Sequence, residues 1–303
     1  MSTIRAFMFH DIRTDTLYPK RYNLKSFLNE EQFKFQINLI QKKYKIIDSK
    51  DIFDIDLTKN QHNYAVLTFD DGLRDHYWVY NYLKSLNIPA TFFIPKMPIL
   101  KKKVMNSHKI QFILAKTEEE TIKNEILDLF DFSTQNIVWE EYSKTSWKNN
   151  WWSKEMIFIT NFLRKYKDDK INNYEITNFL FDKYVIPDEQ SFSEDFYLND
   201  KQICEMVDNG MTIGGHGNIS ENLLLIDDYK KDINESKDFV LKYSDRLIFS
   251  YPNGGYNDDI KEYMSQSGWE LSFTTTQKTL TELDNIDFLE FPRYDSPQKI
   301  KLP

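Results

Sequence analysis

The chain has 303 residues, of which 41% are hydrophobic and 28% charged, so it can bury the core of one large α/β domain or of two small ones. Its formal net charge of -8 at pH 7 argues against nucleic acid or an anionic membrane as the main partner. Aromatic residues make up 16% of the chain, a high share that suits contacts with sugars as well as core packing. Cys204 is the only cysteine, which excludes an intrachain disulfide and a cluster of thiolate ligands, and we expect it to be a core thiol.

The amino-terminal segment MSTIRAFMFHDI holds too short an apolar run for a signal peptide and lacks a cleavage-site pattern. No stretch approaches the roughly 18 apolar residues that a membrane helix needs. We therefore expect a cytoplasmic protein without a transmembrane segment.

The part of the chain before residue 101 alternates between strand and helix patterns. Short apolar runs predict strands, and apolar residues that recur every three to four positions predict helices. Strands are expected at 4–10, 45–48, 64–69 and 88–95, and helices at 29–44 and 75–87. This alternation predicts a parallel sheet or barrel.

Between 101 and 195 the pattern is mostly helical, so we expect a helical insertion within a single domain that spans 1–303. Four tryptophans lie in the middle of the insertion: Trp139, Trp147, Trp151 and Trp152. They form either its own small core or a lid or platform for a sugar. His108 begins the first helix of the insertion, and it would reach substrate or metal if the insertion folds over the rim of the core.

After residue 199 the alternation returns, without a repeat of fixed period and without a low-complexity linker. Helices are expected at 199–210, 227–243 and 257–268, and strands at 211–215, 246–252, 269–275 and 288–295.

The segment VLTFDDG places two carboxylates, Asp70 and Asp71, at the end of an apolar strand and just before Gly72. Side chains alternate along a strand, so the two acids diverge unless the strand stops at Phe69. In that case Gly72 lets the backbone turn, and both carboxylates tilt over the carboxyl end of the strand, where α/β proteins keep their chemistry. The alternative is an ordinary turn in which one of the acids caps the helix that begins near Leu73.

Two histidines share this position at strand ends. His10 ends the first strand and His216 follows the strand MTIGG. Their convergence with the aspartates on one rim favours a metal-assisted or acid–base site. A divalent metal makes adjacent charges tolerable, because one carboxylate ligates it while the other takes a proton from a water. For His62 and His76 we expect a surface role.

Three segments resemble the signatures of the polysaccharide deacetylases, the NodB-homology carbohydrate esterases. They are TFDDG with the following NIPATFFIP (68–72 and 87–95), GMTIGGHGNISENLL (210–224) and IFSYPNGGYND (248–258). Their order and spacing agree with the family, and the 101–195 insertion lies outside the match. The resemblance implies a distorted (β/α) barrel that carries a mostly helical insertion.

Carried over residue by residue, the resemblance implies that Asp70 is the general base. It makes Asp71 and His216 the ligands of a divalent metal, for which we expect Zn²⁺. The backbone N–H of Asn253 would hold the oxyanion, with Tyr251 beside it on the substrate side. Arg293, in FPRYD, would contact the catalytic aspartate.

Two departures from the family pattern stand out. Ser220 occupies the position of the usual third ligand, a histidine, and a serine hydroxyl is a poor zinc ligand. No histidine follows His216 to serve as the late general acid. Members with permuted order carry this acid on the first strand, and FMFH fits that pattern, so His10 is the candidate acid.

The resemblance implies removal of an N-acetyl group from an amino sugar that is linked to a nucleotide, a lipid or a glycan in surface polysaccharide biosynthesis. Two alternatives stay open. One is an esterase that releases O-acetyl from the same kind of sugar. The other is a catalytically weak sugar-binding protein, which Ser220 favours.

Overall fold

The computed structural model of the chain describes residues 2–13, 28–59, 62–144, 152–168, 172–281 and 284–295. These residues form two compact units. The first holds the described residues up to 103 and from 193 onward, and the second holds 104–192. That the whole chain is one domain with an insertion at 101–195 stays a prediction.

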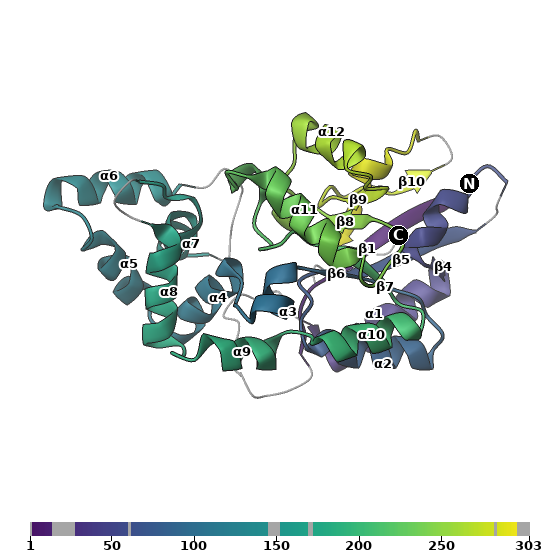
Figure 1. The fold of residues 1–303 in the computed structure, drawn as a ribbon, viewed down its shortest axis with the longest axis horizontal. Helices are drawn as coiled ribbons and strands as arrows, with labels where there is room; N and C mark the ends of the chain where they lie inside the picture. The colour runs from purple at the N-terminus through teal and green to yellow at the C-terminus, as the bar shows by residue number, and fades with distance from the viewer. Residues whose placement is uncertain are drawn as a thin grey trace. The chain divides into compact units, whose positions relative to one another are not determined.

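Seven parallel strands of the described residues form a nearly closed barrel in the first unit (Figure 1). Strand β1 is followed around the barrel by β5, β6, β7, β8 and β9. The ring closes because β11 pairs in parallel with β1, and Phe291 forms a parallel bridge with Phe273 of β9. The strands are β1 (Thr3–Phe9), β5 (Asn63–Phe69), β6 (Thr91–Ile94), β7 (Thr212–Gly215), β8 (Ile248–Ser250), β9 (Leu271–Phe273) and β11 (Arg293–Asp295). The expected distorted (β/α) barrel is thereby confirmed.

Short strands extend this ring at its edges. β4 (Lys45–Ile47) pairs with the first half of β5, while β6 pairs with its last residues. β10 (Leu280–Thr281) runs antiparallel to the start of β1. β2 (Ile12–Arg13) and β3 (Leu28–Asn29) form a separate parallel pair.

Aromatic rings lock the register of the first strands. Phe9, Phe69 and Phe92 are neighbours on β1, β5 and β6, and their rings stack with centroids 5.1 and 4.9 Å apart. Phe33 from the first helix meets two of these rings edge-on. Since all four side chains are buried, a one-residue slip of a strand would expose a ring and is disfavoured.

Helices cover the barrel, with α1, α2 and α10 on one side and α11 and α12 on the other (Figure 1). α1 and α10 begin with capping boxes, in which Asn29 pairs with Gln32 and Asn199 with Gln202. The helices of this unit are α1 (Glu30–Lys43), α2 (Asp75–Ser85), α3 (Lys96–Lys101), α10 (Asp200–Asp208), α11 (Tyr229–Val240) and α12 (Asp258–Gln266). Its 3-10 turns are η1 (Ser49–Asp54), η2 (Leu223–Leu225), η3 (Pro252–Gly254) and η4 (Phe288–Glu290).

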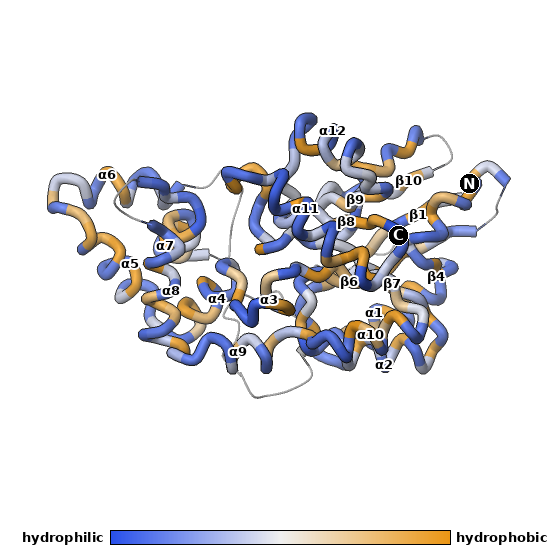
Figure 2. Tube along the Cα trace, in the orientation of Figure 1, coloured by the Kyte–Doolittle hydropathy of each residue, from blue (hydrophilic) through white to orange (hydrophobic). Residues whose placement is uncertain are grey.

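Cys204 is exposed, so the expectation of a core thiol is wrong. α10 buries Ile203 and Met206, which share one face of the helix. Cys204 follows Ile203 by one position, a rotation of about 100° that turns its side chain away from that face. Figure 2 shows this alternation of apolar and hydrophilic residues along α10.

The second unit is a bundle of helices. Helical patterns at 108–115, 119–130, 153–166 and 173–184 predict four of them, whereas α6 and α9 are not predicted. Its core holds aromatic side chains such as Phe112, Phe158 and Phe162. The helices are α4 (Asn106–Lys116), α5 (Glu119–Leu127), α6 (Phe132–Tyr142), α7 (Lys154–Lys165) and α8 (Asn173–Tyr184), and α9 (Glu189–Phe196) leads the chain back to the first unit. None of the helices in the described part of the chain is long and apolar enough to cross a membrane.

The tryptophan-rich segment is described in part. Trp139 lies on α6 with its ring centroid 5.0 Å from that of Phe158, and the ammonium groups of Lys123 and Lys154 lie 5.3 and 4.9 Å from the same centroid. These neighbours favour a packing role for Trp139. Trp152 is half-buried, while Trp147 and Trp151 lie outside the described residues.

Candidate active site

The predicted site residues of the first unit meet at the carboxyl ends of the barrel strands. β1 ends at Phe9, β5 at Phe69, β7 at Gly215 and β8 at Ser250, so the residue after each strand lies on one rim. The N–H of Asp70 donates to the carbonyl of Phe9 over 2.9 Å, which ties the ends of β5 and β1 together.

The two aspartates have different surroundings because β5 ends at Phe69, as expected. Asp71 and Gly72 both have positive φ, 81° and 60°, and this turn sends the second carboxylate away from the first. A Cβ atom on Gly72 would lie only 2.8 Å from Cγ2 of Ile94, so the turn requires glycine. Neither acid caps α2, because the N-cap residue is Arg74 and no side-chain cap bond is formed there. The simple capping alternative is therefore wrong.

Asp70 forms a buried, two-pronged ion pair with Arg293. The distances are 2.8 Å from Nη1 to Oδ1 and 2.9 Å from Nη2 to Oδ2, and the two residues are 2% and 1% exposed. Burial alone would raise the pKa of Asp70, but the Arg293 guanidinium, together with His216 and His10, holds this pKa below its ordinary value. Asp70 is therefore an ionised carboxylate at neutral pH.

The same guanidinium is fixed on every side by oxygen atoms of the barrel. Its Nε donates to the carbonyl of Thr274, Nη1 to the hydroxyl of Thr68 and Nη2 to the hydroxyl of Ser250. Ser250 in turn donates to Oδ2 of Asp70 over 3.1 Å. Sequence reasoning missed Ser250, whose only local signal is its place at the end of β8.

His216 presents one ring nitrogen to Asp71. Its Nδ1 lies 2.9 Å from the carbonyl of Ser250, and since a carbonyl only accepts, Nδ1 carries the proton. Its other nitrogen, Nε2, lies 3.5 Å from Oδ1 of Asp71. The hydroxyl of Ser220 donates to the same Oδ1 over 3.3 Å.

These donors fit a divalent cation through two strong ligands. Two ligands at zinc bond lengths lie about 3.4 Å apart in a tetrahedral arrangement, close to the separation of Asp71 Oδ1 and His216 Nε2. The described residues hold no group of three His, Cys, Asp or Glu side chains placed to bind a metal. Ser220 therefore stands beside the pair without completing a set of three strong ligands.

Asp232 of α11 fixes the loop that follows His216. Its carboxylate accepts the N–H of Asn218 over 3.0 Å and of Ile219 over 3.2 Å. Gly217 has φ 70°, and a Cβ atom there would lie 2.6 Å from Oδ2 of Asp232, so the carboxylate needs the space that glycine leaves. Burial raises the pKa of Asp232 to about 6, while the two amides oppose that rise.

His10 lies at the rim with its side chain 38% exposed, and its Nε2 is 3.9 Å from Oδ2 of Asp70. His62 is exposed, as expected. The expectation of a surface role for His76 is wrong, because its side chain is fully buried and its Nε2 lies 2.6 Å from the backbone carbonyl of His10. Burial lowers the pKa of His76 to about 4.

The loop after β8 carries the other two predicted residues. Asn253 is exposed, and its N–H lies in the first turn of η3, where amide groups have no acceptor within the helix. Tyr251 is buried, and its hydroxyl donates to the carbonyl of Leu289. Its N–H also donates within the barrel, to the carbonyl of Phe273. These contacts favour a packing role for Tyr251, and its contact with substrate stays a prediction.

The second unit contains none of the residues that meet on this rim. His108 is buried on α4, and its approach to substrate or metal stays a prediction.

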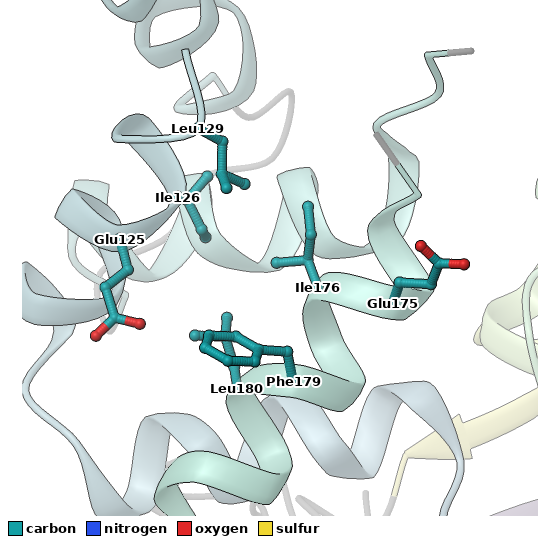
Figure 3. Close-up of a pocket in the computed structure, with 7 residues that line it drawn as sticks. All are labelled: Glu125, Ile126, Leu129, Glu175, Ile176, Phe179 and Leu180. Atoms are coloured by element: carbon teal, nitrogen blue, oxygen red, sulfur yellow. The ribbon is translucent and has the colours of Figure 1, made fainter. Parts of the chain in front are cut away.

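A cavity of about 260 Å³ lies between α5 and α8 of the second unit (Figure 3). Its lining consists of Glu125, Ile126, Leu129, Glu175, Ile176, Phe179 and Leu180. This lining is mainly apolar and has no group suited to acid–base or metal chemistry other than two glutamates.

The buried state of His76 predicts a pH dependence of stability. Its folded pKa, about 4, is below the ordinary value of 6.5, so between these values the unfolded chain binds a proton that the folded chain does not, and stability falls on acidification. Asp232 opposes this, because its raised pKa favours the folded state as pH falls toward 4. The wild type therefore loses stability on acidification that His76→Gln keeps. On going from pH 7.5 to pH 4.5, we expect the free energy of unfolding of His76→Gln to rise by about 2 kcal/mol relative to that of the wild type. Urea unfolding at both pH values measures the difference, and equal pH profiles would contradict a neutral His76.

Comparisons with known proteins show which solved structures share the fold of this chain. No protein-family model matches the chain, and no curated protein matches it. Among solved structures, the Streptococcus pyogenes deacetylase PplD in complex with acetate is similar with a TM-score of 0.57 and 16% identity, over 98% of this chain and 93% of that chain. A de-N-acetylase from Aggregatibacter actinomycetemcomitans is similar with a TM-score of 0.52 and 14% identity, over 98% of this chain and 96% of that chain.

BC0361, a polysaccharide deacetylase from Bacillus cereus, is similar with a TM-score of 0.55 and 15% identity, over 97% of this chain. The chain spans 64% of the length of that protein. At these identities the similarity shows the fold: the chain has the fold of the polysaccharide deacetylases, which the three sequence signatures implied.

Proposed function

We propose that the protein is a metal-dependent hydrolase that removes the N-acetyl group from an amino sugar. The main support for this proposal is that the two adjacent aspartates have different partners. On the rim of a barrel with the deacetylase fold, adjacent aspartates are separated so that Asp70 pairs with Arg293 while Asp71 faces His216. One carboxylate is thus available to accept a proton, and its neighbour is available to bind a cation.

Asp71 and His216 would hold the metal, with the hydroxyl of Ser220 beside them, and we propose Zn²⁺ as its identity. When bound, such a cation lowers the pKa of a coordinated water and polarises a carbonyl oxygen. The carbonyl of Ser250 keeps the proton of His216 on Nδ1, so Nε2 stays free to ligate.

Asp70 would act as the general base. Arg293 keeps it ionised but also weakens it as a base, because the folded pKa lies below the ordinary range. A carboxylate of low basicity can take a proton only from a water that has itself been made acidic. The guanidinium holds both carboxylate oxygens and the hydroxyl of Ser250 also holds Oδ2, so the accepting lone pair has a fixed direction.

His10 would donate the proton that the departing amine needs. Its ring is partly exposed at the rim and near Asp70, so a substrate can approach it. The N–H of Asn253 would stabilise the negative charge that develops on the acetyl oxygen. The products are acetate and a sugar with a free amine. The substrate class we propose is an acetylated amino sugar linked to a nucleotide, a lipid or a glycan.

The test is product analysis on N-acetyl and O-acetyl sugars. The purified protein with added Zn²⁺ is incubated with N-acetylglucosamine oligomers and with an O-acetylated sugar, and acetate and new primary amine are quantified. Acetate and amine in equal amounts support the proposal. Acetate without amine indicates the esterase instead, and binding of sugar without any acetate release indicates a binding protein.

Ser220→His would supply the missing third strong ligand. Ser220 already adopts φ 53°, a conformation that histidine tolerates better than most residues, and its side chain reaches Asp71. We expect the variant to bind Zn²⁺ at least about tenfold more tightly than the wild type, equivalent to about 1.4 kcal/mol. Competition with a chromophoric chelator measures the affinity. Ser193→His, at another buried serine, serves as control, and an unchanged affinity in Ser220→His would show that position 220 does not face the metal.

A further inference from the structure

We propose that His76 is a positioning residue for His10. This inference rests on the proposed function, in which His10 donates a proton to the leaving amine. His76 is a fully buried imidazole that the mechanism above does not use. Its Nε2 lies 2.6 Å from the carbonyl oxygen of His10, the strand-end residue whose side chain faces Asp70.

The hydrogen bond has a defined direction. A carbonyl oxygen only accepts, so Nε2 of His76 carries a proton, and in the neutral ring Nδ1 is then the bare nitrogen. Nδ1 is buried and has no hydrogen-bond partner among the described residues, which fits a nitrogen without a proton to donate. The imidazole is thus a neutral donor with one function, the bond to His10.

The surroundings of the ring keep it in that state. The centroids of Phe69 and Phe92 lie 5.7 and 5.8 Å from the centroid of the imidazole. Full burial among these rings disfavours a charged imidazolium by desolvation, although the hydrogen bond to the His10 carbonyl and the carboxylates of Asp71 and Asp70 act in the opposite sense. Because the pKa of His76 is lowered to about 4, the ring donates this bond as a neutral group at neutral pH.

This bond links the acid to the base through the backbone. The end of β1 is held at two successive carbonyls, that of Phe9 by the N–H of Asp70 and that of His10 by His76. His76 itself belongs to the first turn of α2, which begins five residues after Asp70, and its N–H donates to the carbonyl of Leu73. The segment that carries the two aspartates therefore also fixes the residue that would carry the acid.

The competing explanation is that His76 only fills space in the core. Two substitutions separate the two roles. His76→Phe keeps an aromatic ring of similar size but removes the donor, whereas His76→Gln places an amide N–H near the position of Nε2. A packing role predicts that phenylalanine is tolerated at least as well as glutamine, and a positioning role predicts the reverse.

The experiment measures kcat, KM and Zn²⁺ affinity for these two variants, with His62→Gln as control because His62 is exposed. We expect His76→Phe to lower kcat about 10- to 100-fold while KM and Zn²⁺ affinity change less than about threefold, since a displaced acid is felt at the chemical step. His76→Gln should keep kcat within about threefold of the wild type. Equal losses in both variants, or no loss in a folded His76→Phe protein, would overturn the proposal.

A second measurement does not depend on activity. Proteins labelled at the histidine rings are compared by NMR, with the His10 signals assigned through a His10→Gln variant. We expect the His10 signals to shift or broaden in His76→Phe and to stay near their wild-type positions in His76→Gln. Unchanged His10 signals in His76→Phe would refute the positioning role. If no substrate yields free amine but the His10 signals respond as expected, the proposed function fails while the structural link stands.

Discussion

Asp70→Asn is expected to lower kcat by about 10³-fold, the largest loss of activity among the single substitutions considered. The amide has nearly the shape of the carboxylate but cannot take a proton from water at neutral pH. The buried guanidinium of Arg293 keeps its position only in part, because it loses the charge that it neutralises. The free energy of unfolding is therefore measured with kcat, so that inactivation is not confused with unfolding.

Asp48→Asn is the matched control for this substitution. Asp48 is another buried carboxylate, and it accepts hydrogen bonds from the hydroxyl of Thr212 at the opposite end of β7 from His216. We expect kcat of Asp48→Asn to stay within about threefold of the wild type. Retention of more than a tenth of wild-type activity by Asp70→Asn would contradict the role of Asp70 as base. A protein that only binds sugar would keep its affinity in both variants.

Arg293→Met is expected to destabilise the fold by about 3–5 kcal/mol at pH 7.5, because it leaves the carboxylate of Asp70 buried without a counter-charge. The loss should depend on pH. In the wild type the low pKa of Asp70 contributes stability above about pH 4, which is lost as pH falls through the folded pKa. In the variant, burial raises the pKa of Asp70, so stability is lost as pH rises. The gap between the two proteins should therefore be smaller at pH 4.5 than at pH 7.5.

Urea unfolding at these two pH values tests the prediction, with Arg246→Met as control. Arg246 forms a partly exposed pair with Glu270 at 3.1 Å, so its loss should cost less than about 1 kcal/mol. The double substitution Asp70→Asn with Arg293→Met should be more stable than Arg293→Met alone, because no buried charge is left. A pH-independent loss in Arg293→Met would show that the arginine acts through packing alone.

The local sequence pattern was sufficient to predict the strands of the barrel and the turn after β5. The apolar runs and the glycine after Asp71 encode where β5 stops, and the structure ends β5 at Phe69 as expected. The helix α6 was missed because its apolar residues have little periodicity, and Val138 is the one buried residue within it. The sequence does contain a signal for the burial of His76. His76 falls in phase with Val79, Tyr80 and Leu83, the buried face of α2.

The partners of the site residues could not be found in the same way. Ser250 joins Asp70 to His216, and Asp232 holds the loop after His216, through contacts that only the folded barrel creates. Asp232 does lie in phase with the buried face of α11, but helical phase shows burial and not the partner. The sequence signatures suggested Arg293, and the structure adds that its guanidinium is held on all sides.

The sequence by itself determined the alternation of strands and helices around the barrel, the end of β5 and the placing of two adjacent acids at a strand terminus, because these depend on neighbours a few positions away. Only the tertiary structure decided how each charge is balanced. Asp70 and Arg293 are 223 residues apart, and they meet because β11 closes the ring against β1. The closure of the ring gives the buried Asp70 a counter-charge, while Asp71 faces His216. No local sequence pattern encodes these pairings.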